Sequence, residues 1–353
     1  MPTQGFYVSF SGESAASVNN VFALGPPPGG GKAKVYPNIL NGVPSQLREL
    51  RGMAFGPDGN FYVAQAYKCA SAILKFSGAP AKGSPNLNYI GTFAASSGLI
   101  HPYQPIFHGG NLFVSCQDTN VVLSIYGPQS SSAGKATPNS PFLQKNFPTG
   151  TFNPGTFAPA FSADANAPDF TPVPQAQGGL TFAAATRDPE KTAEKTGSTH
   201  SVRGVAFDSA GYLYAADEGN DRVAVYDPNG AFVGAITQSK SHAIAAPVAL
   251  CFAPSATGGT LFIGSPGSAS LFTFDVSGTP NGDFTADRLV QHDDLKKASG
   301  LALDSNGVIY TGDRRSNMIH TWSAKGDKGP DFAGPFSDSP ELILAVSTPL
   351  VGA

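Results

Sequence analysis

Charge, cysteine and long apolar runs are all scarce in this sequence. Only 13% of its 353 residues are charged, the formal net charge is −3, and no basic run occurs, so we do not expect nucleic acid as a partner. Three cysteines are too few for a disulfide framework. No apolar run approaches the roughly 18 to 20 residues that cross a bilayer as a helix, so no membrane span is expected.

Glycine and proline, in contrast, are abundant, with 41 and 30 residues, as is typical of many short strands joined by tight turns. The chain runs almost at once into the strand-like Phe6 to Phe10, which leaves no room for a signal peptide. We therefore expect either an intracellular protein or the mature form of an exported one. Low charge and much Ser, Thr, Gly, Pro and Asn favour a secreted or periplasmic location.

The stretch from Ser201 to Gln238 is the unit from which the chain is built. It predicts four short strands, because β-forming residues recur between strong turn signals. The expected strands are Val205 to Phe207, Tyr212 to Ala216, Arg222 to Tyr226 and Phe232 to Ile236. In the reversal after the second strand, Gly219 and Asn220 are the residues best suited to positive φ angles.

This pattern recurs along the chain, which indicates a repeat architecture. Related stretches begin at Leu50, Pro105, Pro247 and Ser299. Their turn glycines lie 51, 101, 48 and 48 residues apart. The period is therefore close to fifty residues, with one interval of double length. The glycines are Gly59, Gly110, Gly211, Gly259 and Gly307.

These motifs resemble the NHL-repeat family of β-propellers, whose repeat runs close to G-x-D-G-N-x-Y-V-A-D-x-x-N-x-R-I-x-x-F. The best matches are Gly56 to Ala64 and Ala215 to Val223. The resemblance covers most of the chain outside residues 128–200 and implies an all-β fold, a single propeller of four-stranded antiparallel blades. It implies a fold and not a chemistry. WD40 repeats are not indicated, since the single Trp322 precedes Ser323.

The first repeat is incomplete, because its inner strand is missing. Strands are expected at Phe6 to Phe10, Asn20 to Leu24 and Lys34 to Leu40. We predict that residues 341–347 pair beside residues 6–10 to complete this blade and close the ring. The double interval holds a segment rich in Pro, Ala, Ser and Thr at about 128–200. Six blades with an insertion there are preferred, with an outer strand at Gly150 to Phe161; seven blades are the alternative.

Candidate functional residues gather on one face of the predicted ring. In such a propeller the loops into each inner strand and the turns from second to third strand open on the same side, around the channel. Those turns supply candidate bases, Tyr67 and Asp217. Together with the starts of the inner strands they also supply candidate ligand-binding residues, namely Arg51, Tyr103, Gln117, Asp118, Arg203, Glu218, Asp313 and Arg314.

Histidines precede inner strands in consecutive repeats, a pattern that could place several imidazoles around one axis. The entry loops supply His101, His200, His242 and His292, of which the first three are the metal candidates, and only His108 and His320 fall elsewhere. The NHL propellers that this chain resembles include the peptidyl-hydroxyglycine amidating lyases. This resemblance implies a zinc ion held by histidines in the channel. Loop histidines bonded to their neighbours are the other interpretation. A calcium site of the lactonase type would use Glu341, Asn120, Asn220 and Asp313, which match by residue type alone.

Arg51 and Arg203 occupy the same place in their repeats, four residues before a phenylalanine. The equivalent positions are Tyr103, Val248 and Ser299. Each arginine either pairs with a nearby acid, such as Glu49 or Asp217, or grips an anionic group of a ligand. Two functions follow for this face: a small-molecule or peptide site at the channel mouth, suited to a lyase or hydrolase, or a scaffold for a protein partner.

Overall fold

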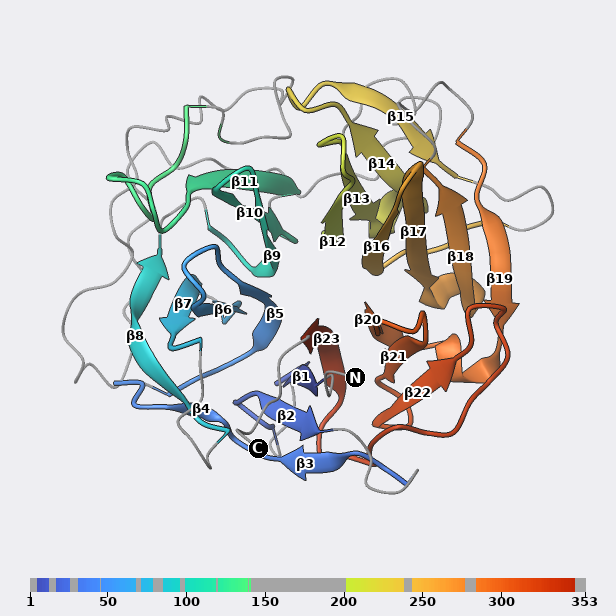
Figure 1. Ribbon diagram of the computed structural model, residues 1–353, viewed down its shortest axis with the longest axis horizontal. Coiled ribbons are helices and arrows are strands. Elements are labelled where there is room, and N and C mark those ends of the chain that lie inside the picture. The colour runs from blue at the N-terminus through green and yellow to red at the C-terminus, as the bar shows by residue number, and fades with distance from the viewer. Residues whose placement is uncertain are drawn as a thin grey trace.

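The computed structural model is a six-bladed β-propeller (Figure 1). It describes residues 5–12, 17–25, 31–44, 46–67, 71–78, 85–95, 99–118, 120–138, 140, 201–237, 243–276 and 284–346. The predicted strand Gly150 to Phe161, and most of the predicted insertion, lie outside these residues. Within them there is no helix long and apolar enough to cross a membrane.

Each blade is an antiparallel sheet whose first strand lies nearest the axis. Blade 2 comprises β5 (Leu50–Phe55), β6 (Phe61–Gln65), β7 (Ala72–Phe76) and β8 (Leu87–Ala94). Blade 4 comprises β12 (Val202–Phe207), β13 (Leu213–Asp217), β14 (Arg222–Tyr226) and β15 (Phe232–Ile236). Blade 5 comprises β16 (Ala249–Ser255), β17 (Gly258–Ser265), β18 (Ser270–Asp275) and β19 (Asp287–Gln291).

Blades 3 and 6 have three strands each within the described residues, where four were predicted. Blade 3 comprises β9 (Pro102–His108), β10 (Asn111–Cys116) and β11 (Val121–Tyr126), and blade 6 comprises β20 (Ala298–Leu303), β21 (Ile309–Asp313) and β22 (Met318–Trp322). Isolated bridges occupy the fourth place, Ile125 to Ala136 in blade 3, and Ile319 to Ala333 and Trp322 to Lys328 in blade 6. In blade 6 that segment contains Pro330 and Pro335, which cannot donate ladder hydrogen bonds.

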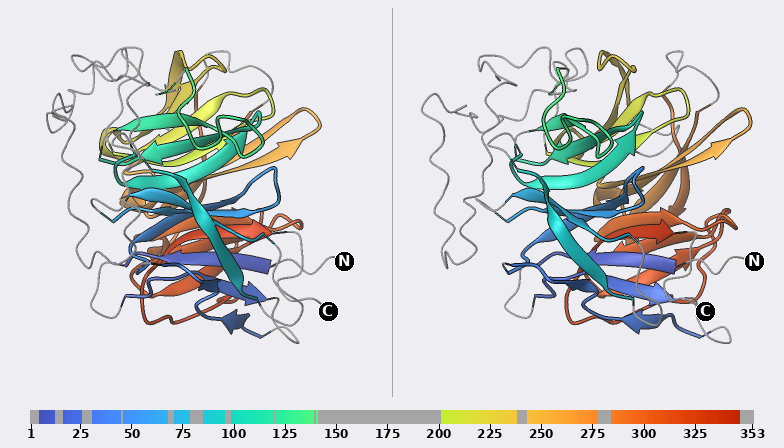
Figure 2. Two further views of the ribbon diagram at one scale, coloured as in Figure 1. Left: turned by 90° about the vertical axis from the view of Figure 1, so that its left-hand side faces the viewer. Right: turned by 60° about the vertical axis from the view of Figure 1, so that its left-hand side comes forward.

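The C-terminal strand closes the ring, as predicted. Blade 1 has the order β23 (Pro340–Val346), β1 (Gly5–Phe10), β2 (Phe22–Gly25) and β3 (Lys34–Tyr36). The register pairs Gly5 with Val346 and Val8 with Ile343. The strand predicted at Lys34 to Leu40 is divided, because β4 (Leu40–Asn41) leaves blade 1 and pairs in parallel with β8, the long outer strand that crosses the edge of blade 2 (Figure 2).

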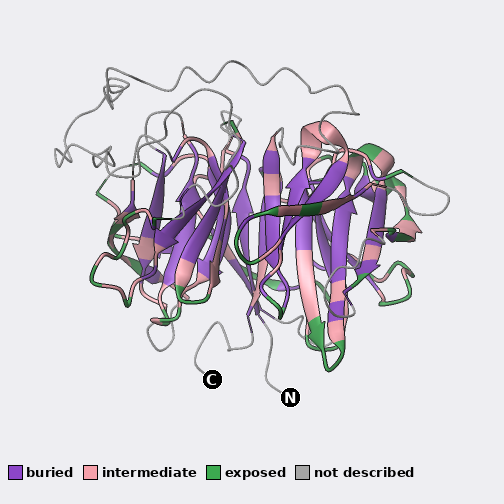
Figure 3. Cartoon of the chain, turned by 90° about the horizontal axis from the view of Figure 1, so that it is seen from above, coloured by how far each residue is buried: buried purple, intermediate pink, exposed green. Residues whose placement is uncertain are grey.

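Apolar side chains fill the junctions between adjacent blades, and most strand residues are buried (Figure 3). Six clusters of buried residues form, one at each junction. At the junction of the last and first blades, the Phe6 and Tyr310 rings lie 4.3 Å apart. The hydrophobic contacts therefore run around the whole ring.

The repeat motif has a structural reason that three blades share. Tyr62 donates its hydroxyl hydrogen to Asp58 at 2.9 Å, Tyr214 donates to Asp208 at 3.1 Å and Tyr310 donates to Asp304 at 3.3 Å. Each aspartate also accepts backbone N–H groups of its own turn. The recurring pattern of Asp in the turn and Tyr in the next strand thus provides a hydrogen-bond partner for the tyrosine hydroxyl within the blade.

Glycine at the start of two inner strands permits close contact between blades. A Cβ atom at Gly52 would lie 2.6 Å from the carbonyl oxygen of Tyr103, and one at Gly204 would lie 2.7 Å from that of Val248. Gly204 donates a 2.8 Å backbone hydrogen bond to the same Val248 oxygen. The inner strands therefore adjoin directly around the axis.

We expect Gly52→Ala to lower the free energy of unfolding by about 3 kcal/mol, because its Cβ would meet backbone atoms that cannot move aside cheaply. Gly91→Ala in β8 is the matched control, since a Cβ there has no neighbour within 4 Å. Urea unfolding of the two variants measures the difference. Equal stability of the two would contradict this close contact between the inner strands.

Candidate functional site

The channel mouth is built from equivalent positions of several blades. The inner strands begin at the same end of the propeller axis, and we call this end the channel mouth. The second residues of four of these strands are Glu341 in β23, Arg51 in β5, Tyr103 in β9 and Arg203 in β12. A residue with left-handed φ immediately precedes three of these strands: Glu49 at 46°, His101 at 50° and Ser201 at 62°.

Backbone hydrogen bonds tie these entry residues to the next turn of the same blade. The carbonyl oxygens of Glu49, His101 and Ser201 accept from the N–H groups of Ala66, Gln117 and Glu218. The turns after the second strands are thereby fixed beside the starts of the inner strands. This arrangement brings Gln117, Asp118 and Glu218 to the face that carries Tyr103 and Arg203.

A buried carboxylate at the start of β23 lies between two guanidinium groups. Glu341 is 1% exposed, and its Oε1 atom lies 3.6 Å from Nη1 of the equally buried Arg51. Its Oε2 atom lies 3.5 Å from Nε of Arg314, which arrives from the turn after β21. The Oε2 atom has no hydrogen-bond partner in the part of the chain that the structure describes. Two blades thus present arginines to one buried acid from a third.

Tyr103 lies beside this cluster with its side chain fully buried. Its hydroxyl has no hydrogen-bond partner among the described residues, unlike those of Tyr62 and Tyr214. Burial, and next the negative charge of Glu341, raise the pKa of Tyr103, while the nearby arginines act in the opposite direction with less effect. The phenol is therefore neutral and remains a hydrogen-bond donor.

Arg203 covers Tyr103 and is itself held by protein groups. Its guanidinium carbon lies 5.2 Å from the centre of the Tyr103 ring. Its Nε and Nη2 atoms each lie 2.8 Å from Oε2 of Glu218, and its Nη1 donates to Gln117. Both arginines singled out in the sequence therefore pair with acids, but with Glu218 and Glu341 and not with the suggested Asp217 and Glu49.

His101 and Asp118 form a pair at the rim of the mouth. The His101 Nδ1 atom lies 3.0 Å from Asp118 Oδ2, and the His101 Nε2 atom is buried without a hydrogen-bond partner among the described residues. The hydrogen bond from His101 lowers the pKa of Asp118 below its ordinary value, against the effect of burial and with help from Arg203 and Arg51. Asp118 is therefore ionised at neutral pH.

The predicted zinc site is not assembled by the residues that the structure describes. His200 and His242 lie outside them, and the Nδ1 atom of His101 is already bonded to Asp118. Across the described ranges, no group of three or more His, Cys, Asp or Glu side chains is placed to hold a metal ion. The histidine set therefore stays a prediction.

The residues suggested as calcium ligands from their residue type are instead bonded to other protein groups. Glu341 faces arginines, and the Asn120 side chain accepts from the Ser201 N–H. Asp313 accepts the N–H groups of Arg315 and Ser316 within its own turn. These contacts do not fit a cation shared by these residues.

The two candidate bases lie in different blades. Asp217 is fully buried in β13, where its Oδ2 lies 2.8 Å from Nε of Arg222, so it stabilises its own blade. Tyr67 lies at the turn after β6, with the Arg48 guanidinium 4.7 Å from its ring centre.

A hollow of about 670 Å³ lies elsewhere on the molecule, between the short 3₁₀ helix η5 (Pro266–Ser268) and β19 of blade 5. Ser268, Arg288, Gln291 and Lys296 are among its lining residues. None of the channel-mouth residues lines it. The hollow is therefore separate from the candidate site.

Glu341 is the residue of the channel mouth that sequence reasoning placed only as a calcium ligand by type. Residues 340–346 resemble the inner strand that begins at Pro247, and this resemblance is the signal that could have revealed the position of Glu341. In that alignment Glu341 corresponds to Val248, and Val248 is the position equivalent to Arg51 and Arg203. An acid at this position in one blade and arginines in two others predict an ion pair across the channel.

Comparison with solved structures places the chain among β-propellers. A putative 6-phosphogluconolactonase from Bacteroides fragilis is 12% identical, with a TM-score of 0.55 over 98% of this chain and 98% of that one. The corresponding protein from Bacteroides uniformis is 14% identical, with a TM-score of 0.51 over 93% and 82%. A nidogen/laminin complex is 12% identical, with a TM-score of 0.57 over 98% and 99%.

At these identities the likeness concerns the fold alone. No protein-family model matches the sequence, and the search of curated proteins gives no match either.

Proposed function

We propose that this chain is an NHL-type propeller that binds a small polar molecule or a peptide at its channel mouth, in a site suited to a hydrolase or a lyase. One observation carries the proposal: the buried hydroxyl of Tyr103 and the buried Oε2 of Glu341 both lack hydrogen-bond partners among the described residues. Leaving such groups unsatisfied costs about 1–3 kcal/mol each, so native proteins rarely retain them without a purpose.

The chemistry of these two atoms defines the ligand. The neutral Tyr103 hydroxyl needs an acceptor, whereas the carboxylate oxygen of Glu341 needs a donor. A ligand hydroxyl or a peptide group can both accept and donate, and so can satisfy the two atoms together. The side chains of Arg203 and Arg314, which are partly exposed, cover these atoms. They must shift to admit the ligand, and their guanidinium groups can then donate hydrogen bonds to it.

The charges at the mouth argue for a ligand of low net charge. Three arginines, Arg51, Arg203 and Arg314, face three acids, Glu341, Glu218 and Asp118. The carboxylates already neutralise the guanidinium groups, so a ligand with several negative charges would gain little. The names of the two Bacteroides structures, both putative lactonases, agree with a hydrolase that acts on a polyhydroxylated substrate.

The test uses three probes: the neutral D-glucono-1,5-lactone, the anion D-gluconate and the zwitterion glycylglycine. We expect at least one to bind by isothermal titration, and lactone turnover above the spontaneous rate if the site is hydrolytic. Arg203→Met should weaken that binding about tenfold, the value of a lost charge-assisted hydrogen bond. Failure of all three probes to bind, or binding unchanged in Arg203→Met, would contradict the proposal.

A protein-binding scaffold is the second candidate, and the nidogen/laminin complex is the neighbour that suggests it. Such an interface usually shows an exposed apolar patch. The described residues leave three large hydrophobic side chains exposed, Val35, Ile90 and Val233, on the outer strands of three different blades. They do not gather on the channel face, so the described surface supports the ligand site better.

A further inference from the structure

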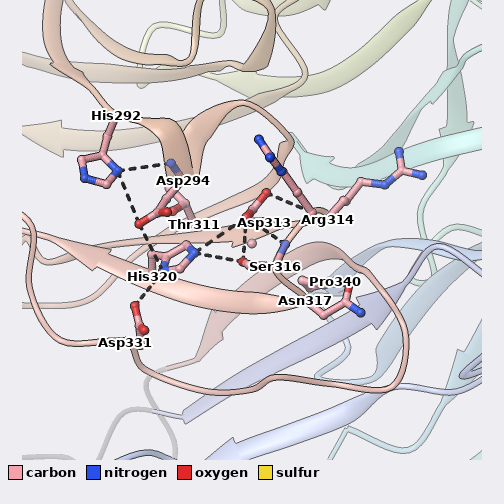
Figure 4. A network of polar contacts seen from close by, with 12 residues as sticks. His292, Asp294, Thr311, Asp313, Arg314, Ser316, Asn317, His320, Asp331 and Pro340 are labelled. Atoms are coloured by element: carbon pink, nitrogen blue, oxygen red, sulfur yellow. Dashed lines mark hydrogen bonds and ion pairs between the residues drawn. The ribbon is translucent and has the colours of Figure 1, made fainter.

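His320 joins three separate segments of blade 6 and its surroundings (Figure 4). It lies on β22 and is 3% exposed. Its Nδ1 atom lies 2.7 Å from Asp331 Oδ1, on the segment that returns along β22. Its Nε2 atom lies 3.2 Å from Ser316 Oγ, in the turn after β21. The ring is therefore held from both sides.

The hydrogen atoms around this ring can be assigned from the partners alone. Ser316 Oγ lies 2.6 Å from Asp313 Oδ2 and donates its single hydrogen there, because a carboxylate only accepts. Ser316 must then accept from His320 Nε2, and Asp331 must accept from His320 Nδ1. Both ring nitrogens carry hydrogen, so His320 is an imidazolium.

The order Ser316, His320, Asp331 resembles a hydrolytic triad, but the serine hydrogen points away from the histidine. In a triad the serine donates to a neutral imidazole, which then accepts the proton during attack. Here the Ser316 hydroxyl donates its hydrogen bond to Asp313, and the protonated Nε2 atom of His320 has no lone pair with which to accept one. The group is therefore a clamp and not a nucleophilic centre.

Further charges surround the ring on every side. Asp294 Oδ2, from the loop before β20, lies 3.8 Å from Nδ1, and Asp313 Oδ2 lies 3.9 Å from Nε2. Lys328 pairs with Asp294 and lies 4.0 Å from Asp331, and His292 lies 3.4 Å from Asp294. Burial alone would lower the pKa of His320, but the carboxylates together raise it.

The turn that His320 clamps carries Arg314 to the channel mouth. Asp313 accepts from Arg315 N–H and Ser316 N–H, which sets the path of the turn. The Arg314 N–H donates to Lys297 at 3.0 Å, and its carbonyl accepts from Ser339 Oγ. From this turn the Arg314 side chain reaches Glu341.

We propose that the imidazolium of His320 is a positioning group that fixes the turn 313–317, and with it Arg314, so that ligand binding at the channel mouth weakens when this histidine loses its proton. The binding consequence rests on the proposed function; the positioning does not. Because the folded state raises the pKa, the stabilisation is complete below the unfolded value of about 6.5 and is lost as pH rises through the folded value.

Two NMR signals test the positioning without any ligand. The His320 ring and the Arg314 Nε–H should titrate with one midpoint above pH 6.5. In His320→Gln the Arg314 signal should no longer titrate, and in Asp331→Asn, which keeps His320, its midpoint should fall to lower pH. His108→Gln, which removes a histidine stacked on Phe207, is the control and should leave the Arg314 titration intact. An Arg314 signal that ignores His320 overturns the proposal.

Binding of D-gluconate, measured at 0.15 M salt to screen distant charges, tests the consequence. We expect an affinity at least threefold weaker above the His320 midpoint than below it in the native chain, and no such change in His320→Gln. If gluconate does not bind at any pH while the Arg314 signal titrates with His320, the proposed ligand fails and the clamp stands. Binding with the same pH dependence in His320→Gln overturns the regulatory role.

Discussion

A chain that ends at Ser339 is expected to lose the propeller fold. It would lack β23, the inner strand of blade 1, whose side chains Leu342, Ile343 and Val346 are each less than 9% exposed. Burying each such side chain stabilises a protein by about 1.5–3 kcal/mol, so their loss approaches the total stability of about 5–15 kcal/mol typical of a domain. The unpaired edge of β1 would also be exposed.

The matched control ends at Val346, which leaves every pairing of β23 with β1 in place. Thermal unfolding followed by circular dichroism should show a cooperative transition for the control and none for the shorter chain. A synthetic peptide of residues 338–353 should restore the transition when added to the shorter chain. A cooperative transition of the shorter chain near the native temperature would show that closure contributes little.

Tyr103→Phe is expected to abolish most ligand binding while leaving the protein at least as stable. The substitution removes a buried hydroxyl that has no hydrogen-bond partner among the described residues, so the free energy of unfolding should stay the same or rise by about 1 kcal/mol. Affinity for the probe that binds the native chain should fall at least tenfold, because one hydrogen bond to the ligand is lost.

Tyr214→Phe is the opposite control. The Tyr214 hydroxyl is also buried, but it donates to Asp208 at 3.1 Å, far from the channel mouth in its own blade. Its removal should cost about 1–3 kcal/mol of stability and leave ligand affinity unchanged. If Tyr103→Phe instead destabilises the chain as much as this control and binding is unaffected, the Tyr103 hydroxyl has a structural partner, such as a buried water, and no ligand role.

The sequence was sufficient for the architecture because the repeat carries strand and turn signals at fixed spacing. The reversal predicted after β13 is present, but the prediction that Gly219 and Asn220 take positive φ angles is wrong. Asp221 adopts the left-handed φ of 54°, and Gly219 and Asn220 lie in the 3₁₀ helix η4 (Glu218–Asn220). The same place before the third strand is left-handed at Asn120, Ala269 and Asn317. Position in the repeat, and not glycine content, decides which residue takes this conformation.

The ion pairs of the channel could not be predicted from neighbours in the sequence. Arg51 meets Glu341, which comes from the far end of the chain and reaches it only because the ring closes. His320 lies away from the entry loops. The turn before β22 and the segment after it bring its partners Ser316 and Asp331 to the two sides of its ring. Closure and local path therefore determine the site, whereas the repeat pattern determines the scaffold.

A crystal structure of the protein soaked with the probe that binds most tightly in solution tests the central claim most directly. The account predicts density for the probe at the channel mouth, with one of its polar groups within hydrogen-bond distance of Tyr103 Oη and Glu341 Oε2, and with the Arg203 or Arg314 side chain displaced. Density for a single water between those two oxygen atoms, with the probe absent or bound elsewhere, would contradict it.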